Sequence, residues 1–349
     1  MANSIYVLCP DLKRPVGAIK GYYRYVDILN NNNFQAYILH SRAGFRCDWF
    51  QNETKIASIR HARIEELYGR IYYKLFSKRS TRDIYLQGGG GDKIETSDYL
   101  VIPSALAELF IHRSQGVRKV IFNRNCRTKT FTHFEDRSQA FDNPYVHPDV
   151  SGIIAVSEDT KQYMEFAFPD KSVHRHYNSI DSDKFCFSSA KKKQICYMPR
   201  KNREDVVQVL NMLSLRGKVD GFAFVPIENK TETQVAEILR ESLIFLSFGY
   251  PEGCPRPPAE AMASGCIVVG YHGWGGREYF DPEYSYPIEY GDIVNFVATT
   301  EEVVAAFSYE PQKMIEKSCK GATCIRETYS LRREEENVVS YWKNRFANC

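Results

Sequence analysis

The stretch SFGYPEGCPRPPAEAMA, from Ser247 to Ala263, places two glutamates eight residues apart, at Glu252 and Glu260. It starts at the end of an apolar run, continues as a loop rich in Gly and Pro, and then opens a helix near Pro257 or Pro258. A helix N-terminus offers free backbone N–H groups and a positive dipole end, which suit an anion such as a diphosphate. Carboxylates beside it are natural acceptors for sugar and ribose hydroxyls. The spacing alone also fits an ordinary loop–helix junction with glutamates on the surface.

A second candidate group is the basic cluster Arg200, Lys201 and Arg203, which follows the apolar run Gln194–Met198. The cluster lies where a strand is expected to lead into a helix. Arg and Lys hold an anion such as a diphosphate by charge-assisted hydrogen bonds, which contribute about 1.5–3 kcal/mol each. The pattern therefore favours diphosphate binding. The plainer alternative is a solvated run of charges at the start of a helix.

Two further candidates come from the first part of the chain. Gly17, in the stretch PVGAIKG after the first expected strand, has no Cβ and would let a ligand approach the backbone closely. This stretch lacks the spacing of the dinucleotide-binding fingerprint, and a plain strand–helix turn explains it equally well. Asn123 directly follows the apolar run KVIF. We include both positions among the predicted substrate-binding residues.

The elements that must position these residues come in two series. Short apolar runs that predict strands alternate with segments whose apolar residues have helical spacing. This alternation predicts an α/β fold with two doubly wound, Rossmann-like domains. In such folds ligands lie beyond the carboxyl ends of the strands, here in a central cleft that the two domains face. The expected strands are Ser4–Cys9, Phe34–His40, Asp98–Ile102, Lys119–Phe122, Gly152–Val156, Gln194–Met198, Gly221–Pro226, Ser242–Ser247 and Cys266–Gly270. The expected helices include Ser104–Ser114, Glu158–Phe168, Glu204–Leu215 and Thr233–Glu241.

The polar stretch Asn178–Ser189 marks the break between the two series. We predict an N-terminal Rossmann-like domain over residues 1–180 and a C-terminal Rossmann-like domain over residues 181–330. Residues 331–349 are predicted to form a C-terminal helix that packs back on the N-terminal domain. A chain of 349 residues exceeds what a single core usually supports, which agrees with two domains.

Composition excludes several classes of protein. The net charge of +3 is too small for a typical nucleic-acid binder, so no nucleic-acid partner is expected. The ten cysteines include no CxxC pair, so the usual signature of a zinc site is missing. They are too sparse for a disulfide scaffold and fit free thiols in a reducing cytosol.

The chain shows neither a signal peptide at its N-terminus nor an apolar run long enough to span a membrane. We therefore expect a cytoplasmic protein, with peripheral contact to the inner face of a membrane as an option. The segment Tyr68–Arg82 supports that option, because it has no acidic residue and repeats a basic residue at every fourth position beside an apolar stripe. Such a helix could rest on anionic lipid near a lipid-linked acceptor. The common alternative is a core stripe with a solvated basic face.

The stretch around Glu252 and Glu260 resembles the Glu-x7-Glu motif of the family 4 glycosyltransferases, usually written EGFG followed by proline and EAMA. In that family the first glutamate contacts the donor sugar and the second binds the ribose of the nucleotide. Two other stretches resemble family motifs in the same order. NSIDSDKF, from Asn178 to Phe185, is similar to the NGID segment at the domain linker. GWGGREY is similar to a downstream GG-x-E loop and adds the predicted substrate-binding residues Gly275, Gly276 and Glu278.

The resemblance implies a GT-B fold, with residues 1–180 as the acceptor-side domain and residues 181–330 as the nucleotide-sugar-binding domain. It also implies a retaining transfer that needs neither a metal ion nor a cofactor, with a nucleotide-diphosphate sugar as co-substrate. The chain agrees in having no DxD motif in a suitable strand-end loop. Arg200 matches the family's arginine, whereas Asp205 stands at its usual lysine, so that role would pass to Lys201 or Arg203. Together with Glu252, Arg200 and Lys201 are the predicted catalytic residues. Around them, the predicted donor-binding residues are Gly253, Cys254, Arg256 and Pro257.

This sequence departs from the family pattern at two further places. Cys254-Pro255 replaces the usual Phe-Gly, and proline has no N–H to donate, so the donor sugar cannot be inferred by analogy. Many members also carry a histidine after the strand that corresponds to KVIF, and no histidine stands there. His133 lies ten residues after Asn123 and is the candidate replacement; the alternative is a loop histidine without a role.

The predicted function is transfer of a sugar from a nucleotide-diphosphate sugar to a glycan, a lipid-linked sugar or a small molecule, with retention at the anomeric carbon. The leaving diphosphate would itself take the acceptor proton. Other activities share the GT-B fold, so an epimerase of nucleotide sugars and a sugar phosphorylase remain alternatives. A non-catalytic subunit that binds nucleotide sugars is the alternative from another class, because the expected histidine and lysine are missing.

Overall fold

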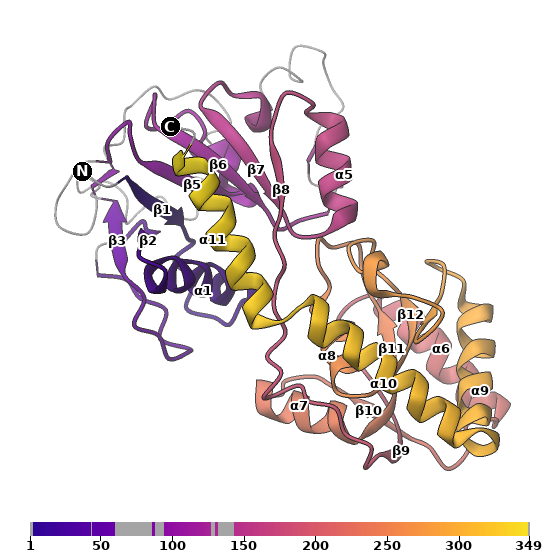
Figure 1. Cartoon of the computed structure of the whole chain (residues 1–349). Helices are drawn as coiled ribbons and strands as arrows, with labels where there is room; N and C mark the ends of the chain where they lie inside the picture. Colours follow the sequence, from indigo (N-terminus) through magenta and orange to yellow (C-terminus); the bar gives the residue numbers. More distant parts are fainter. Residues whose placement is uncertain are drawn as a thin grey trace.

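The computed structural model describes residues 3–42, 44–59, 86–87, 94–126, 130–131 and 143–347. The predicted membrane-facing segment 68–82 and the candidate His133 lie outside these residues. The described chain forms two largely parallel sheets with helices packed on them, as the alternating sequence pattern predicts. Figure 1 shows each sheet at the centre of its own body. The chain passes from one body to the other more than once.

The first sheet has eight strands in the order β4-β3-β2-β1-β5-β6-β7-β8. Its described strand pairs are parallel, apart from the antiparallel pair of β3 and β4. Its central strands read as unbroken apolar runs because a parallel sheet is covered on both faces. The strands are β1 (Ser4–Leu8), β2 (Gln35–His40), β3 (Ile56–Ile59), β4 (Leu86–Gln87), β5 (Tyr99–Pro103), β6 (Arg118–Asn123), β7 (Val150–Ala155) and β8 (Val173–Arg175).

Two longer helices pack on this sheet. α1 (Gly17–Asn31) buries one apolar face that includes Tyr22 and Val26. α5 (Glu158–Ala167) begins after Ser157, whose hydroxyl accepts a hydrogen bond from the Thr160 backbone N–H at 3.2 Å. η3 (Pro144–Val146) is a single 3-10 turn before β7.

The helix expected over Ser104–Ser114 is shorter than predicted. The structure has a 3-10 turn, η1 (Ser104–Leu106), followed by α3 (Ala107–Phe110). Ser114 and Gly116 have φ values of 51° and 78°, which turn the chain into β6. The predicted helix was therefore too long: α3 ends at Phe110, and the left-handed residues Ser114 and Gly116 prevent the helix from continuing to the predicted end.

The second sheet has five parallel strands in the order β10-β9-β11-β12-β13. All four expected strands of this half are present within about two residues. The strands are β9 (Lys192–Tyr197), β10 (Ala223–Pro226), β11 (Ser242–Phe248), β12 (Ile267–Tyr271) and β13 (Tyr286–Pro287). The helical segments are α6 (Arg203–Arg216), α7 (Glu232–Glu241), α8 (Arg256–Ala263), η4 (Arg277–Tyr279), α9 (Ile293–Tyr309) and α10 (Pro311–Thr328).

The last helix, α11 (Leu331–Ala347), returns to the first body and runs alongside α1 (Figure 1). Trp342 is fully buried there, and its indole N–H donates to the hydroxyl of Tyr25 at 2.8 Å. Val338 and Tyr341 belong to the same buried cluster as the N-terminal strand β1. The core of the N-terminal sheet is thus completed by residues from the far end of the chain.

Each sheet has one place where the strand order reverses direction. In the first sheet this is between β1 and β5, and in the second it is between β9 and β11. Loops that leave the carboxyl ends of two such strands diverge to opposite faces and leave a crevice, which is where doubly wound folds bind ligands. The basic cluster follows β9 and the glutamate-bearing loop follows β11, so both predicted donor-binding segments lie at this crevice.

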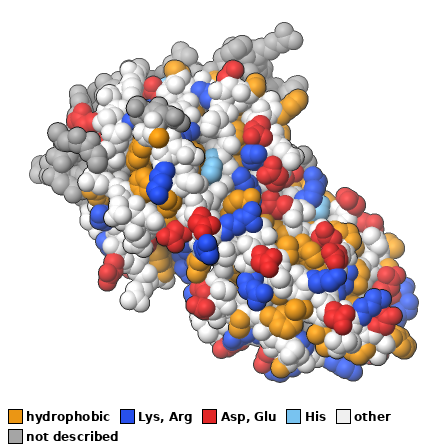
Figure 2. Space-filling model, in the orientation of Figure 1, with side chains coloured by type: hydrophobic (Ala, Val, Ile, Leu, Met, Phe, Trp, Pro, Cys, Tyr) orange, Lys and Arg blue, Asp and Glu red, His pale blue; other side chains and the backbone are white. Residues whose placement is uncertain are grey.

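Figure 2 shows acidic and basic side chains interspersed over the visible face of the C-terminal body. Within the described part of the chain, no helix is both long and apolar enough to cross a membrane.

Candidate active site

Three loops at the carboxyl ends of β9, β11 and β12 are joined into one unit. Asn202 donates from its side-chain amide to the carbonyl oxygens of Phe248 and Gly249, at 3.1 and 3.3 Å. The Glu252 N–H donates to the Gly273 carbonyl at 3.1 Å, and the Gly275 N–H donates back to the Glu252 carbonyl at 3.2 Å. These bonds fix the three loops relative to each other, so their side chains meet at a defined place.

The centre of this unit is an ion pair between two predicted catalytic residues. Lys201 Nζ lies 2.5 Å from Glu252 Oε1, and the side chains are 29% and 32% exposed. The lysine comes from the loop after β9 and the glutamate from the loop after β11, so the pair spans the crevice. A half-exposed cation and carboxylate that face each other there can hold a phosphate oxygen and a sugar hydroxyl side by side.

The second glutamate of the motif lies on α8, where Arg256 Nη2 approaches Glu260 Oε1 to 3.2 Å. The Glu260 side chain is only 13% exposed. Burial raises the pKa of Glu260, and the nearby charge of Arg256 opposes that rise. The carboxylate therefore keeps a limited opening to solvent, with Arg256 as its ion-pair partner and the charge of Lys20 as a weaker influence.

The N-terminus of α8 offers fewer donors than the sequence suggested. The helix begins at Arg256, and Pro257 and Pro258 occupy the next two positions. Because proline has no N–H, only the first of these three positions can donate to an anion. The N-cap residue, Pro255, gives no side-chain cap, so the positive end of the helix dipole is left uncapped by it.

The other two members of the basic cluster remain on the surface. Arg200 and Arg203 are exposed, and neither makes a hydrogen bond or ion pair with any residue that the structure describes. Asp205, at the position where the resembling family has lysine, accepts a hydrogen bond from the Tyr271 hydroxyl at 2.9 Å. The carboxylate of Asp205 is thus engaged by Tyr271 within the C-terminal domain. Among the three basic residues of the cluster, only Lys201 contacts a glutamate of the motif in the described structure.

The donor loop lies directly against the N-terminal domain. A Cβ on Gly253 would come within 2.6 Å of the Arg124 carbonyl and 2.8 Å of the Asn125 carbonyl, so only glycine permits this approach. Cys126 Sγ lies 3.2 Å from the Pro251 carbonyl. Cys254 packs against the core cluster of the N-terminal domain. The structure therefore places Gly253 and Cys254 at the contact between the domains.

The glycines of the loop after β12 have a similar packing role. A Cβ on Gly275 would lie 2.0 Å from the Gly253 carbonyl oxygen, and one on Gly276 would lie 2.4 Å from the His272 carbonyl oxygen. Both positions exclude any side chain because another backbone passes there. Their predicted contact with substrate stays a prediction, while the need for glycine is explained by the packing.

The carboxylate of Glu278 joins the two domains. Its Oε1 accepts hydrogen bonds from the guanidinium of Arg175 and the hydroxyl of Tyr329. Its Oε2 accepts from the backbone N–H of Glu158, the first residue of α5, at 2.6 Å. Both oxygens are thus engaged, and the predicted contact with substrate would require one of these bonds to open.

The two predicted positions of the N-terminal domain differ in their surroundings. Gly17 begins α1, and apart from its chain neighbours and the backbone of its own helix, no atom of the described residues lies within 4 Å of the place that its Cβ would occupy. Asn123 is 1% exposed, and its Oδ1 accepts from the Asn125 N–H at 3.0 Å. Its Nδ2 has no hydrogen-bond partner among the described residues. Gly17 thus leaves open space, whereas Asn123 is enclosed with a free donor.

The sequence patterns did not indicate Arg124. It follows β6, beside the position at which many members of the resembling family carry a histidine. Its guanidinium carbon lies 5.3 Å from the ring centroids of both Tyr22 and Phe122. Burial lowers the pKa of Arg124, and Nη1 lacks a hydrogen-bond partner within the described chain. The position of Arg124 directly after a central strand was the only feature of the sequence that could have pointed to it. Its burial could not be predicted, because it depends on how the two domains pack against each other.

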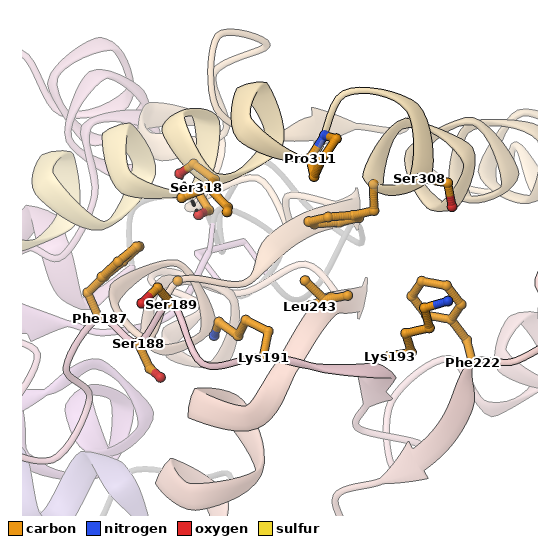
Figure 3. A pocket seen from close by; sticks show the side chains of 13 residues that line it. Phe187, Ser188, Ser189, Lys191, Lys193, Phe222, Leu243, Ser308, Pro311 and Ser318 are labelled. Carbon is orange, nitrogen blue, oxygen red and sulfur yellow. Dashed lines mark hydrogen bonds between the residues drawn. The ribbon is translucent and has the colours of Figure 1, made fainter.

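One pocket of the C-terminal domain lies away from these residues. It has a volume of about 280 Å³ and is lined by residues that include Lys191, Leu243 and Pro311, shown in Figure 3. Lys191 and Leu243 stand at the amino ends of β9 and β11, whereas the candidate site lies at their carboxyl ends. The pocket is therefore separate from the site.

Within the described residues, no three His, Cys, Asp or Glu side chains cluster in a way that could hold a metal ion.

Comparison with known proteins adds to this geometry. No family model matches the chain. An alpha-1,6-glucosyltransferase of Actinobacillus pleuropneumoniae serotype 7 is 29% identical over 157 residues, which are 44% of this chain and 47% of that protein. The match therefore spans about half the length of this curated relative.

Several solved structures resemble the whole chain. S. aureus TarM has a TM-score of 0.68 at 11% identity, over 98% of this chain and 99% of that chain. Sucrose-phosphate synthase from Thermosynechococcus elongatus has a TM-score of 0.67 at 9% identity, over 99% and 100% of the two chains. Anabaena HepE in complex with UDP-glucose has a TM-score of 0.65 at 12% identity, over 98% and 99%. With two doubly wound domains that match these glycosyltransferases over nearly its full length, the protein has the GT-B fold predicted from its sequence.

Proposed function

We propose that this protein is a glycosyltransferase that moves a sugar from a nucleotide-diphosphate sugar to an acceptor, with retention at the anomeric carbon. The observation that carries the proposal is the Lys201–Glu252 pair, which spans the strand-order reversal of the C-terminal sheet. A cation for the diphosphate and a carboxylate for the sugar are the two groups that donor binding requires at that crevice. The fold shared with glycosyltransferases supports the same assignment.

In the proposed complex the nucleotide lies on the C-terminal domain. Glu260 holds the ribose hydroxyls, Lys201 and Arg200 face the diphosphate, and Glu252 holds the sugar. UDP-glucose is the first donor to test, since HepE was solved with UDP-glucose and the partial relative is named a glucosyltransferase. The acceptor, a glycan, a lipid-linked sugar or a small molecule, enters from the N-terminal domain near Gly17, where the structure leaves open space.

Catalysis in this proposal rests on positioning and on electrostatic stabilisation of the leaving diphosphate. The bond from the anomeric carbon to the diphosphate oxygen breaks, and the acceptor oxygen forms its bond on the same face of the sugar. The acceptor proton passes to the departing diphosphate. Lys201 and Arg200 neutralise the negative charge that develops there, a role that a metal ion fills in other transferases. Contact between the domains excludes water and so limits hydrolysis of the donor.

The test combines a ligand panel with two variants. UDP-, GDP-, ADP- and dTDP-sugars are compared by thermal shift, because a ligand that binds only the folded state raises the melting temperature. Glu260→Ala should weaken nucleotide affinity roughly tenfold to hundredfold, the value of a hydrogen bond to a charged group. Arg200→Ala should lower turnover.

The matched controls are Glu336→Ala and Arg332→Ala on α11, which pair with each other at 2.7 Å on an exposed face. These should leave affinity and turnover at the wild-type level. Wild-type nucleotide affinity and turnover in both site variants would refute the model of the site.

A further inference from the structure

Arg124 of the N-terminal domain has a guanidinium nitrogen that is buried without a hydrogen-bond partner among the described residues. This nitrogen is Nη1, and the guanidinium carbon of Arg124 lies 5.3 Å from the ring centroids of both Tyr22 and Phe122. A buried cation without hydrogen bonds is costly, because the protein does not replace the water it has lost. The two aromatic rings and the charge of Glu334 compensate only a part of that cost.

Arg256, from the other domain, also has a buried nitrogen without a hydrogen-bond partner among the described residues. Arg256 begins α8, beside the donor loop, and its Nε is also buried with no partner in the described part of the chain. Its Nη2 pairs with Glu260 at 3.2 Å. The charge of Arg256 lies close enough to contribute to lowering the pKa of Arg124, after the larger effect of burial. Arg256 comes three positions after Gly253, where a Cβ would lie 2.6 Å from the Arg124 carbonyl oxygen, so the two arginines belong to segments in contact across the domain boundary. Each has one buried nitrogen without a partner among the described residues, and an anion between two such cations would be stabilised.

The first helix leaves room for this arrangement. A Cβ on Gly21 would lie 3.0 Å from both Nη1 and Nη2 of Arg124, which is too close for an undisturbed contact. Gly21 stands in the interior of α1, where glycine costs about 1 kcal/mol relative to alanine. One turn earlier, Gly17 faces open space. The helix thus accepts a destabilising residue at the position where a side chain would push the guanidinium away.

We propose that Arg124 and Arg256 together bind a phosphate or carboxylate group of a substrate at the boundary between the two domains. The proposal rests on the proposed function only for the source of that group, either the diphosphate of the donor or an acidic group of the acceptor. One arginine comes from each domain, so the bound anion bridges them. Arg124 is then a binding residue that the N-terminal domain contributes to the site.

The experiment compares wild type with Arg124→Met, Gly21→Ala and the exposed control Arg332→Met. The probes are inorganic pyrophosphate, UDP and uridine, followed by calorimetry and thermal shift. Arg124→Met should weaken pyrophosphate and UDP about tenfold or more and leave uridine unchanged. Gly21→Ala keeps the charge and displaces it by a few tenths of an ångström, so it should weaken both anions about threefold. Arg332→Met should match wild type.

The outcomes show whether Arg124 binds an anion and whether that anion belongs to the donor or to the acceptor. Free Arg124→Met should melt no lower than wild type, because the variant removes an uncompensated buried charge. Wild-type affinity of Arg124→Met for pyrophosphate and UDP, with an unchanged KM for acceptors that carry phosphate or carboxylate, would overturn the proposal. Unchanged UDP affinity with a raised KM for such acceptors assigns the anion to the acceptor. If wild type binds pyrophosphate through Arg124 but no nucleotide, the anion pair stands and the proposed transferase function fails. If Arg124→Met does not fold, Gly21→Ala decides.

Discussion

At the scale of the residue, the candidate site is made by side chains that are distant in sequence. Lys201 and Glu252 are 51 positions apart and still form a 2.5 Å ion pair, because β9 and β11 are neighbours in the sheet. Each could be predicted from its place after an apolar run. Their pairing could not, since it depends on strand order. Arg124 was missed for a related reason: its burial comes from α1 and from the other domain, which no local pattern records.

Replacing Lys201 tests the most direct of these assignments. Lys201→Met removes a cation that faces the diphosphate in the proposed complex, so kcat with the best donor should fall roughly tenfold to hundredfold, the value of one charge-assisted hydrogen bond. Lys201→Arg keeps the charge and should retain most of the activity. Steady-state kinetics of both variants decide the matter. Equal activity of Lys201→Met and wild type would show that the lysine serves only to hold Glu252.

At the scale of the element, apolar periodicity was a good guide to the strands and to the longer helices. The four strands expected in the C-terminal half occur there, because each contains a short apolar run; β9, β11 and β12 have buried centres, whereas β10, at the edge of the sheet, is partly exposed. Short elements escaped prediction: β13 has two residues and β8 has three, too few to form a pattern. The helix α8 was placed correctly, but the effect of its prolines on the free N–H groups appeared only once its first residue was known to be Arg256.

A variant of α8 tests whether the end of this helix faces the diphosphate. Pro257→Ala adds one N–H at the second helical position while keeping a residue that the first turn accepts. One added hydrogen bond contributes about 0.5–1.5 kcal/mol, so UDP should bind roughly twofold to tenfold more tightly. Isothermal calorimetry with UDP measures this, and uridine serves as the ligand without phosphate. If UDP and uridine change equally or not at all, the helix end does not contact the phosphates.

At the scale of the whole molecule, the two domains are joined by contacts between residues far apart in the chain. Glu278 of the C-terminal domain accepts from the backbone of Glu158, which lies 120 positions earlier. Lys20 of α1 pairs with Glu232 of α7 at 2.9 Å. Near the linker, Glu334 of α11 accepts from Ser179 and approaches Arg24 to 3.4 Å. Sequence patterns predict the two domains and where the chain passes between them, but long-range pairs of this kind follow from the folded arrangement alone.

The carboxylate of Glu334 gives this arrangement a dependence on pH. Burial alone would raise the pKa of Glu334, but hydrogen bonding from His176, the charges of His176 and Arg24, and the Ser179 hydrogen bond lower it to about 2. A carboxyl group whose folded pKa lies below its unfolded value of 4.5 stabilises the fold above pH 4.5 and loses that contribution as pH falls towards 2. Burial lowers the pKa of His176, so its charge is largely absent near neutral pH, and the contribution of Glu334 there is at most about 3 kcal/mol.

Urea unfolding of wild type and Glu334→Gln at several pH values tests this expectation. At pH 7 the variant should have a free energy of unfolding lower by up to about 3 kcal/mol, because glutamine is neutral beside Arg24. The difference should shrink steadily below about pH 4.5, since wild type then loses the same charge. Glu336→Gln, on the exposed face of α11, is the control and should follow wild type throughout. A difference between Glu334→Gln and wild type that stays constant from pH 7 to pH 3 would mean that the loss comes from hydrogen-bond geometry and that the charge of Glu334 does not hold the domains together.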